Sequence, residues 1–377
     1  MSSLVHPSLY GPIFQWVLFV LVLIMAIRCN SNEIYNNSVA NSMSSIGKLL
    51  VLAITLIVGY RPVHWMFGDM VIYTMGYSAR EISGQADFLS TLSSFEGEYV
   101  FAALQDFCIQ YADVHFMFFV CAICYFVAPC IACSRLLGKY WFAPYTAMAA
   151  MIDYWGFAVN GVRNGAAAGL MILALSFKKR ISLAVPLAFL SIGIHKSMAL
   201  AAAAGILAHF YKNTRMYICG WFGSIALSAV MGRTISAFMV AHLGGGDERM
   251  SRYLAYAQDK EMMALQSSSG FRADFLLYSA VPIFVGYWYT EIKQVNDSDY
   301  RWWLNTYITA NAFWVLMMWS ANTNRFAAIS WFIAGIVLMY PFFKYKFIAN
   351  QGRYAAYAIL CWYVFCFYQN IIRGGLI

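Results

Sequence analysis

A small set of ionisable side chains stands out in a very apolar sequence. Charged residues make up 11% of the 377 residues, and eight ionisable ones lie within or at the edge of long apolar runs: Arg61, Asp69, Arg163, His195, Arg233, Arg272, Asp274 and Arg325. Charged side chains in such positions are costly and are typical of functional sites. The planar guanidinium of arginine offers a fork of N–H donors that matches phosphate geometry, and it stays positively charged. The set therefore predicts a site for an anionic, phosphate-bearing ligand, and a lipid pyrophosphate would suit it well.

The two most informative residues are Arg163 and His195. Arg163 opens an apolar run that ends at Phe177, and Asp153 on the preceding run offers a purely structural ion pair as the alternative role. His195 lies between two short apolar segments, and interrupted spans are typical of membrane binding sites. An unperturbed histidine is largely neutral near pH 7 and can accept a proton. Asp69 is the competing base, and the sequence does not choose between them.

The elements that must position these residues are membrane helices. The chain is 62% hydrophobic, and apolar runs of about 20 residues can each cross ~30 Å of hydrocarbon. Continuous runs without alternation favour helices over a barrel. We predict an all-α polytopic membrane protein that forms one integral domain over residues 1–377. About twelve transmembrane helices are expected, at 11–27, 46–60, 113–133, 139–155, 161–177, 182–195, 197–211, 216–232, 273–290, 302–320, 325–343 and 354–371.

The distribution of basic residues predicts the orientation, because they accumulate in cytoplasmic loops. Placing Lys178-Lys179-Arg180 inside assigns 14 basic and 4 acidic residues to the inner side and 11 basic and 13 acidic residues to the outer side. Two long loops then face outward. We expect interfacial helices in the loop 61–114. The loop 241–274 is a candidate lid over an outer cavity, with a plain solvated connector as the alternative.

Several kinds of chemistry have no support in the sequence. It contains no Walker A loop, no G-x-S-x-G, no H-E-x-x-H and no dinucleotide fingerprint. The acidic residues do not gather as a divalent-metal site requires, and the basic residues are scattered over loops instead of forming a patch. We therefore predict no metal, no cofactor and no nucleic-acid partner.

Five short pieces of the sequence together resemble one family. They are Arg61 followed by Gly68-Asp69 and Tyr73, Glu98-Tyr99 before an apolar stretch, Gly161-Val162-Arg163-Asn164, His195-Lys196-Ser197, and Asn324-Arg325-Phe326. The outline, over roughly residues 1–345, resembles the EpsG-like branch of the Wzy polymerases of bacterial surface polysaccharides. This chain departs from the family pattern at Asn164, where Gln is common, and at Gly68, where Thr is common. It also has Tyr99 where Pro often follows the acidic residue.

The resemblance implies a glycosyltransferase-C-like fold and a metal-independent membrane glycosyltransferase that joins oligosaccharide repeat units into O-antigen or a related polysaccharide. Its donor and acceptor would both be carried on undecaprenyl pyrophosphate, at the periplasmic face of the bacterial cytoplasmic (inner) membrane. Membrane lipid, a chain-length regulator and a flippase are the candidate partners. Two alternatives stay open: an O-antigen ligase, which shares the donor, and a non-enzymatic transporter or flippase of lipid-linked sugars, although transporters usually carry internal repeats.

This chemistry assigns roles to the candidate residues. Charge builds on the departing pyrophosphate, so preorganised cations should stabilise the transition state. The predicted catalytic residues are His195, Arg163 and Asp69. The predicted contacts to the pyrophosphate and glycan are Arg61, Arg163, Arg272, Arg325 and Tyr73.

The orientation can be tested with two single cysteines in a background that lacks the native ones. Ser182→Cys lies beside the basic cluster and Ser267→Cys lies in the second long loop. On intact spheroplasts, an impermeant thiol reagent should label position 267 and leave position 182 unlabelled, because only the first faces outward. Labelling of position 182 alone would invert the topology.

Overall fold

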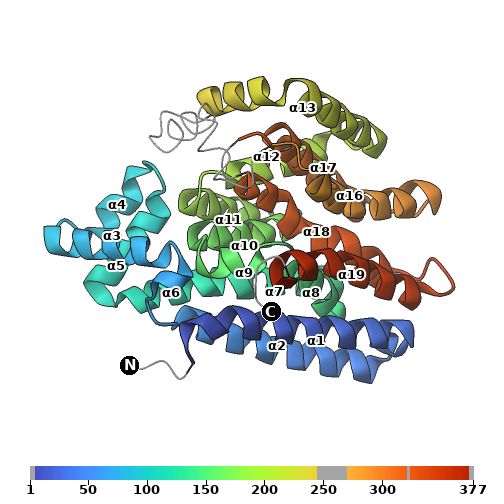
Figure 1. Cartoon of the computed structure of the whole chain (residues 1–377), viewed down its shortest axis with the longest axis horizontal. Coiled ribbons are helices and arrows are strands. Elements are labelled where there is room, and N and C mark those ends of the chain that lie inside the picture. Colours follow the sequence, from blue (N-terminus) through green and yellow to red (C-terminus); the bar gives the residue numbers. More distant parts are fainter. Residues whose placement is uncertain (1–4, 244–269, 321–322, 373–377) are drawn as a thin grey trace. The chain divides into compact units, whose positions relative to one another are not determined.

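The computed structural model describes residues 5–243, 270–320 and 323–372. Within these ranges the chain forms helices joined by short turns and contains no strand (Figure 1). Six of these helical segments are long and apolar enough to cross a membrane: Pro7–Asn30, Asn37–Gly59, Val114–Tyr140, Thr214–Met239, Asn324–Lys344 and Gln351–Ile372. Three shorter apolar helices follow one another at Val162–Ser176, Ile181–Ile194 and Met198–Phe210. The protein is an all-α polytopic membrane protein, and this part of the prediction is confirmed.

The chain divides into two compact units, and each is described by itself. The first comprises residues 1–202 and 339–377, and the second comprises residues 203–338. The first unit contains η1 (Pro7–Leu9), α1 (Tyr10–Asn30), η2 (Glu33–Tyr35), α2 (Asn37–Gly59), η3 (Trp65–Phe67), α3 (Met70–Ser83), α4 (Phe88–Ser94), α5 (Tyr99–Tyr111), α6 (Val114–Ala122), η4 (Ile123–Val127), α7 (Ala128–Leu137), η5 (Gly138–Tyr140), α8 (Phe142–Ala149), α9 (Tyr154–Val159), α10 (Val162–Ser176), α11 (Ile181–Ile194), α19 (Gln351–Phe367) and η7 (Tyr368–Ile372).

The second unit contains α13 (Thr214–Leu243), α16 (Ala273–Tyr287), η6 (Trp288–Ile292) and α17 (Ser298–Leu316). Helices α12 (Met198–Phe210) and α18 (Asn324–Lys344) each begin in one unit and end in the other. A buried amide links three helices of this unit, because Asn311 accepts a hydrogen bond from Trp221 Nε1 (2.8 Å) and donates one to Ser330 (3.0 Å). Buried polar groups paired in this way fix the register of apolar helices.

Helix α10 lies at the centre of the first unit and packs closely through small residues. A Cβ atom on Gly169 would lie 2.1 Å from the carbonyl oxygen of Cys124, and one on Gly165 would lie 2.5 Å from that of Phe157. Small residues allow such close backbone approach between membrane helices. The apolar sequence of α10 therefore does more than make the helix hydrophobic, because its glycines also set how closely α10 packs against its neighbours.

One predicted span is interrupted. The sequence predicted a continuous helix over 139–155, whereas α8 ends at Ala149 and α9 begins only at Tyr154. The break coincides with Asp153, whose φ of 63° lies in the left-handed region. A non-glycine residue is rare there and cannot continue a right-handed helix. The short helix α9 then leads into the turn before α10.

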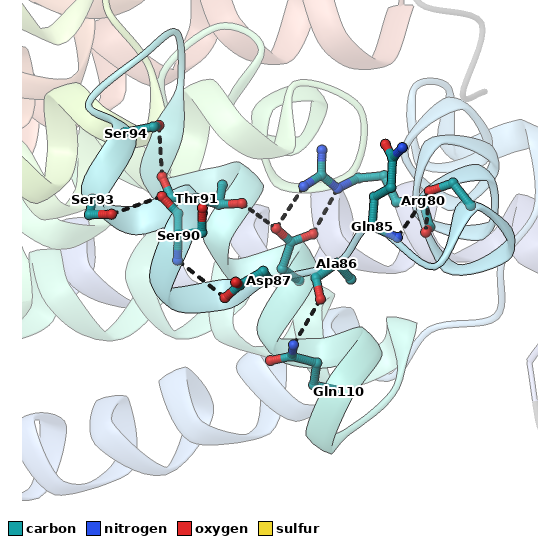
Figure 2. A network of polar contacts seen from close by, with 11 residues as sticks. Arg80, Gln85, Ala86, Asp87, Ser90, Thr91, Ser93, Ser94 and Gln110 are labelled. Atoms are coloured by element: carbon teal, nitrogen blue, oxygen red, sulfur yellow. Dashed lines mark hydrogen bonds and ion pairs between the residues drawn. The ribbon is translucent and has the colours of Figure 1, made fainter.

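The long loop predicted over 61–114 contains the short helix η3 and three α-helices, α3, α4 and α5, and polar contacts tie the α-helices together (Figure 2). The carboxylate of Asp106 is 0% exposed. It accepts two hydrogen bonds from Arg80, through Nε (2.8 Å) and Nη2 (2.6 Å), and a third from the Thr91 hydroxyl (2.5 Å). Gln110 donates to the carbonyl of Ala86 (2.8 Å). The other predicted loop, 241–274, lies largely outside the described residues.

The Asp106 network generates an asymmetric stability prediction. Arg80→Ala should cost roughly 3 kcal/mol of unfolding free energy, since removing one partner leaves a buried carboxylate unpaired. Breaking a buried pair typically costs roughly 3–5 kcal/mol. We expect the low end here, because the Arg80 side chain is 39% exposed and water reaches its position. Asp106→Ala should cost less, since a freed guanidinium there can hydrate.

Unfolding of the purified protein in detergent measures these differences. The control is Glu81→Ala, an exposed neighbour on α3, which should change stability by less than about 0.5 kcal/mol. Equal, small effects for all three variants would contradict a stabilising role for the network.

Candidate active site

Three chain segments of the first unit bring an arginine, a glutamate and a histidine together. Glu98 precedes α5, Arg163 lies in the first turn of α10, and His195 follows the end of α11. Arg163 Nη1 and Glu98 Oε2 form an ion pair, and His195 Nε2 lies 3.8 Å from Glu98 Oε1. The three side chains are 16%, 18% and 19% exposed. The cluster is therefore partly buried yet open to a ligand.

Arg163 is held by more than its ion pair. Its Nε donates to the Tyr73 hydroxyl (3.2 Å), and its guanidinium carbon lies 5.0 Å and 5.3 Å from the ring centroids of Tyr73 and Phe101. Aromatic faces attract a cation at these distances. Of the five N–H groups of a guanidinium, these contacts use the one on Nε and one on Nη1. Within the described residues no hydrogen bond uses the N–H groups of Nη2, which are the donors proposed for a ligand.

The protonation of His195 follows from its neighbours. The backbone N–H of Ser197 donates to Nδ1 (3.3 Å), and the Ser197 hydroxyl lies 2.8 Å from the same nitrogen. A backbone N–H can only donate, so Nδ1 is an acceptor and we assign the proton of the neutral ring to Nε2. This N–H faces Glu98. His195 is therefore arranged to donate a hydrogen bond toward the cluster, whereas its basic nitrogen is already occupied.

The turn before Arg163 is fixed by two further contacts. The backbone N–H of Asp69 donates to the side-chain oxygen of Asn160 (2.7 Å). Gly68, with φ of 59°, makes this possible, since a Cβ atom there would lie 2.3 Å from the same oxygen. The Asp69 and Tyr73 positions are four residues apart at the start of α3, so they share one face of that helix. Because Tyr73 is hydrogen-bonded to Arg163, Asp69 lies beside the cluster of Arg163, Glu98 and His195.

The second contact to this turn comes from Arg61, which is 1% exposed. Its Nη1 donates to the carbonyl of Val58 (2.5 Å) and its Nη2 to that of Val159 (3.0 Å). The rings of Phe67 and Phe118 lie 5.3 Å and 5.4 Å from its guanidinium carbon. Burial lowers the pKa of Arg61 to about 10, so it stays charged at neutral pH. This enclosed geometry favours a positioning role over the predicted contact to substrate.

The other two predicted binding arginines lie in the second unit. Arg272 precedes α16 and donates to both carboxylate oxygens of Asp274, at 3.0 Å from Nε and 2.7 Å from Nη2. Its guanidinium carbon lies 4.1 Å from the ring centroid of Phe275. Arg325 lies in the first turn of α18 and is partly exposed. Their participation in the Arg163 site remains a prediction.

Sequence reasoning did not assign Glu98 to the site. Glu98 entered the sequence analysis only as part of the family pattern and was given no role, and the partner considered for Arg163 was Asp153. In the structure the carboxylate that pairs with Arg163 is Glu98, 65 residues away in sequence. The acidic residue of the family pattern, which is Glu98 in this chain, was the available signal.

These features define an all-α, multi-pass membrane protein with an Arg–Glu–His cluster at converging helix ends. In the described ranges no group of three or more His, Cys, Asp or Glu side chains is arranged to hold a metal ion. The EpsG family model matches residues 46–375, and the chain belongs to the EpsG family. This confirms the resemblance and indicates a polysaccharide polymerase-like role. Neither the curated proteins nor the solved structures gave a match.

Gly193 provides a test of the geometry between Glu98 and His195. A Cβ atom at this position would lie 2.3 Å from Val100 Cγ2 and 2.9 Å from Tyr99 Cζ. Gly193→Ala should therefore push the start of α5 away from α11 and separate the two site residues. Since a misplacement of about 1 Å can cost on the order of 100-fold in rate, polysaccharide production in a complemented deletion strain should fall at least tenfold.

The matched control is Gly223→Ala on α13, where an added Cβ meets nothing within 4 Å. It should leave both membrane level and polysaccharide production unchanged. Normal production by Gly193→Ala protein at a normal membrane level would contradict the proposed dependence on this close approach.

Proposed function

We propose that this protein is the polymerase that joins undecaprenyl-pyrophosphate-linked oligosaccharide repeat units into a surface polysaccharide. The reaction would take place at the periplasmic face of the cytoplasmic membrane and need no metal. The observation that carries the proposal is the partly buried cluster of Arg163, Glu98 and His195 in a chain of the EpsG family. The cluster combines a cation whose Nη2 donors make no hydrogen bond within the described residues, an N–H donor on His195 and a carboxylate, which are the groups that this transfer requires.

In the proposed reaction a sugar hydroxyl of one lipid-linked unit attacks the anomeric carbon of the growing chain. A new glycosidic C–O bond forms, and the bond from that carbon to the pyrophosphate oxygen breaks. Undecaprenyl pyrophosphate leaves with the electron pair, and the hydroxyl proton passes to a carboxylate of the site. Arg163 and the Nε2–H of His195 stabilise the charge that develops on the leaving group.

We assign the proton acceptor to Glu98. Its Oε2 is bound by Arg163, whereas its Oε1 lies 3.8 Å from His195 Nε2, so that an attacking hydroxyl placed beside this pair could approach both atoms. The sequence favoured His195 or Asp69 as the base. Nδ1 of His195 accepts a hydrogen bond from Ser197, which leaves the imidazole better suited to donate. Asp69 remains the alternative carboxylate, since it adds to the negative potential around Arg163.

Arg163 substitutions test the function. Arg163→Ala removes the donor edge and should cost about 2.7–4 kcal/mol of transition-state stabilisation, the usual effect of deleting one preorganised oxyanion donor. Lipid-linked single units should accumulate while the protein stays in the membrane at a normal level. Arg163→Lys should recover part of the activity, because the charge returns without the planar fork.

The readout is the polysaccharide ladder on a gel, together with the membrane level of each variant. A full-length ladder from well-expressed Arg163→Ala protein would refute the assignment. Loss of the protein from the membrane would instead indicate that the pair with Glu98 is structural. Transfer of finished chains to a different acceptor, with no elongation by purified protein, would indicate a ligase.

The same assay separates the candidate bases. Glu98→Gln keeps size and hydrogen bonding but cannot accept the proton, so it should abolish elongation, whereas Asp69→Asn should retain measurable activity. General-base groups typically contribute 10²–10⁴-fold. The reverse pattern would assign the base to Asp69.

A further inference from the structure

The first unit contains a long apolar groove that the Arg163 cluster does not use. It has a volume of about 1210 Å³ and lies between helices α1 and α2, with side chains of η4, α8 and α9 also lining it. Phe126, Trp141 and Tyr145 contribute aromatic surface. Pockets for drug-sized molecules typically measure about 300–1,000 Å³. The groove is larger than such a pocket and fits an extended hydrocarbon.

The groove runs along most of the length of two membrane helices. Its lining begins at Tyr10 on α1 and reaches Met25, and on α2 it reaches from Met43 to the following Tyr60. At ~1.5 Å per residue these stretches span about 20–25 Å, most of the ~30 Å thickness of a hydrocarbon core. An occupant of the groove would therefore lie across the membrane and along the helices.

One flank of the groove is open. Lining side chains on both helices are strongly exposed in the structure, such as Ile13 (49%) on α1 and Ile57 (53%) on α2. The floor is tightly built, since a Cβ atom on Gly47 would lie 2.9 Å from the Trp141 ring. This combination allows a chain to enter from the side, out of the bilayer, onto a fixed apolar surface.

The polar end of the groove meets the contacts that position Arg163. Tyr60 stacks on Phe119 of α6 (4.9 Å between ring centroids), one helical turn after His115, so Asp113 and His115 lie at the same end of the groove. The next residue, Arg61, donates to the carbonyl of Val159, four residues before Arg163.

The other helix is connected in the same way. Tyr10 lines the groove and packs edge-on against Phe67 (5.4 Å), directly before the Gly68-Asp69 pair that contacts Asn160. The groove thus ends where the site begins.

We propose that this groove binds the polyprenyl chain of the lipid-linked substrate, with the pyrophosphate end directed toward Arg163. The assignment rests on the proposed function for its choice of lipid. The groove's size, apolar lining and lateral opening fit a single long hydrocarbon, and its continuity with the Arg163 turn fits a hydrocarbon that carries an anionic head. A bulk phospholipid chain is the competing occupant, and the test is designed to separate the two.

The probe is an undecaprenyl phosphate analogue with a photoreactive diazirine in its isoprenoid chain. The full-length protein, in nanodiscs of phosphatidylethanolamine and phosphatidylglycerol, is irradiated with it, and labelled peptides are mapped by mass spectrometry. Labels should fall on the groove-lining residues, chiefly those of α1 and α2. Unlabelled undecaprenyl phosphate should compete, whereas farnesyl phosphate, with the same head on a much shorter chain, should compete poorly.

A matched pair of substitutions on α2 tests the position. Leu50 lines the groove, whereas its neighbour Leu49 is exposed and does not line it. Leu50→Trp fills the groove and displaces several methylene groups, so labelling should fall roughly tenfold or more. Leu49→Trp adds the same side chain outside the groove and should be labelled like the wild type.

Three results would overturn the proposal: equal labelling of the Leu50→Trp and Leu49→Trp variants, labels that fall outside the residues lining the groove, and equal labelling of the groove by a photoreactive phosphatidylethanolamine. Arg163→Ala should be labelled nearly as strongly as the wild type, because the hydrocarbon supplies most of the binding. Polyprenyl labelling in the groove of a chain that shows no polymerase activity would therefore support this inference while the proposed reaction fails.

Discussion

The ion pair between Arg163 and Glu98 constrains how the helices around the candidate site pack in the first unit. Removing two charges from water is costly, and a partly buried pair is tolerated only with good geometry and further polar contacts. On the arginine side Tyr73 accepts a hydrogen bond and Phe101 offers its ring face, and His195 faces the carboxylate. Because the partners come from α5, α10 and α11, three helices must meet at one place. The close packing of α10 at Gly165 and Gly169, and of α11 at Gly193, allows them to do so.

Arg61 extends this arrangement from the site to the membrane. Its guanidinium is enclosed, yet it donates to carbonyls at the end of α2 and the end of α9 and lies over two aromatic rings. A buried cation satisfied mainly by carbonyl oxygens fixes the two backbone segments relative to each other. It also adds a permanent positive charge between the apolar groove and the Arg163 cluster. That position suits a substrate whose tail is hydrocarbon and whose head is an anion.

The sequence was sufficient for the fold class and for most helix positions, since these follow from the length and continuity of apolar runs. It also selected Arg163 and His195, because a charge at the edge of an apolar helix is rarely retained without a role. The sequence did not predict features that depend on contacts between distant residues or on the conformation of a single residue. The pairing of Arg163 with Glu98 joins residues 65 positions apart. The break at Asp153 depends on one left-handed residue, and nothing in the apolar pattern around it distinguishes it from a continuous span.

The burial of Arg61 is a second feature that the sequence did not reveal. From sequence, an arginine after a span and an arginine before one look alike, and both were assigned to substrate. Arg61 is 1% exposed, whereas the Arg163 side chain is 16% exposed, and this difference follows from the rings and carbonyls that surround each guanidinium. Only the folded chain brings Phe67 and Phe118 to one and Glu98 to the other.

An arginine already paired with a carboxylate should bind a second anion only weakly, but the proposed reaction removes this conflict. In the resting site Glu98 holds the guanidinium in place and limits its freedom, which reduces the ordering needed later. When Glu98 accepts the hydroxyl proton, its negative charge is lost and its attraction for Arg163 weakens. At that same moment negative charge grows on the departing pyrophosphate. The cation is thus released from one anion as the other forms, so that its stabilisation is greater in the transition state than in the ground state.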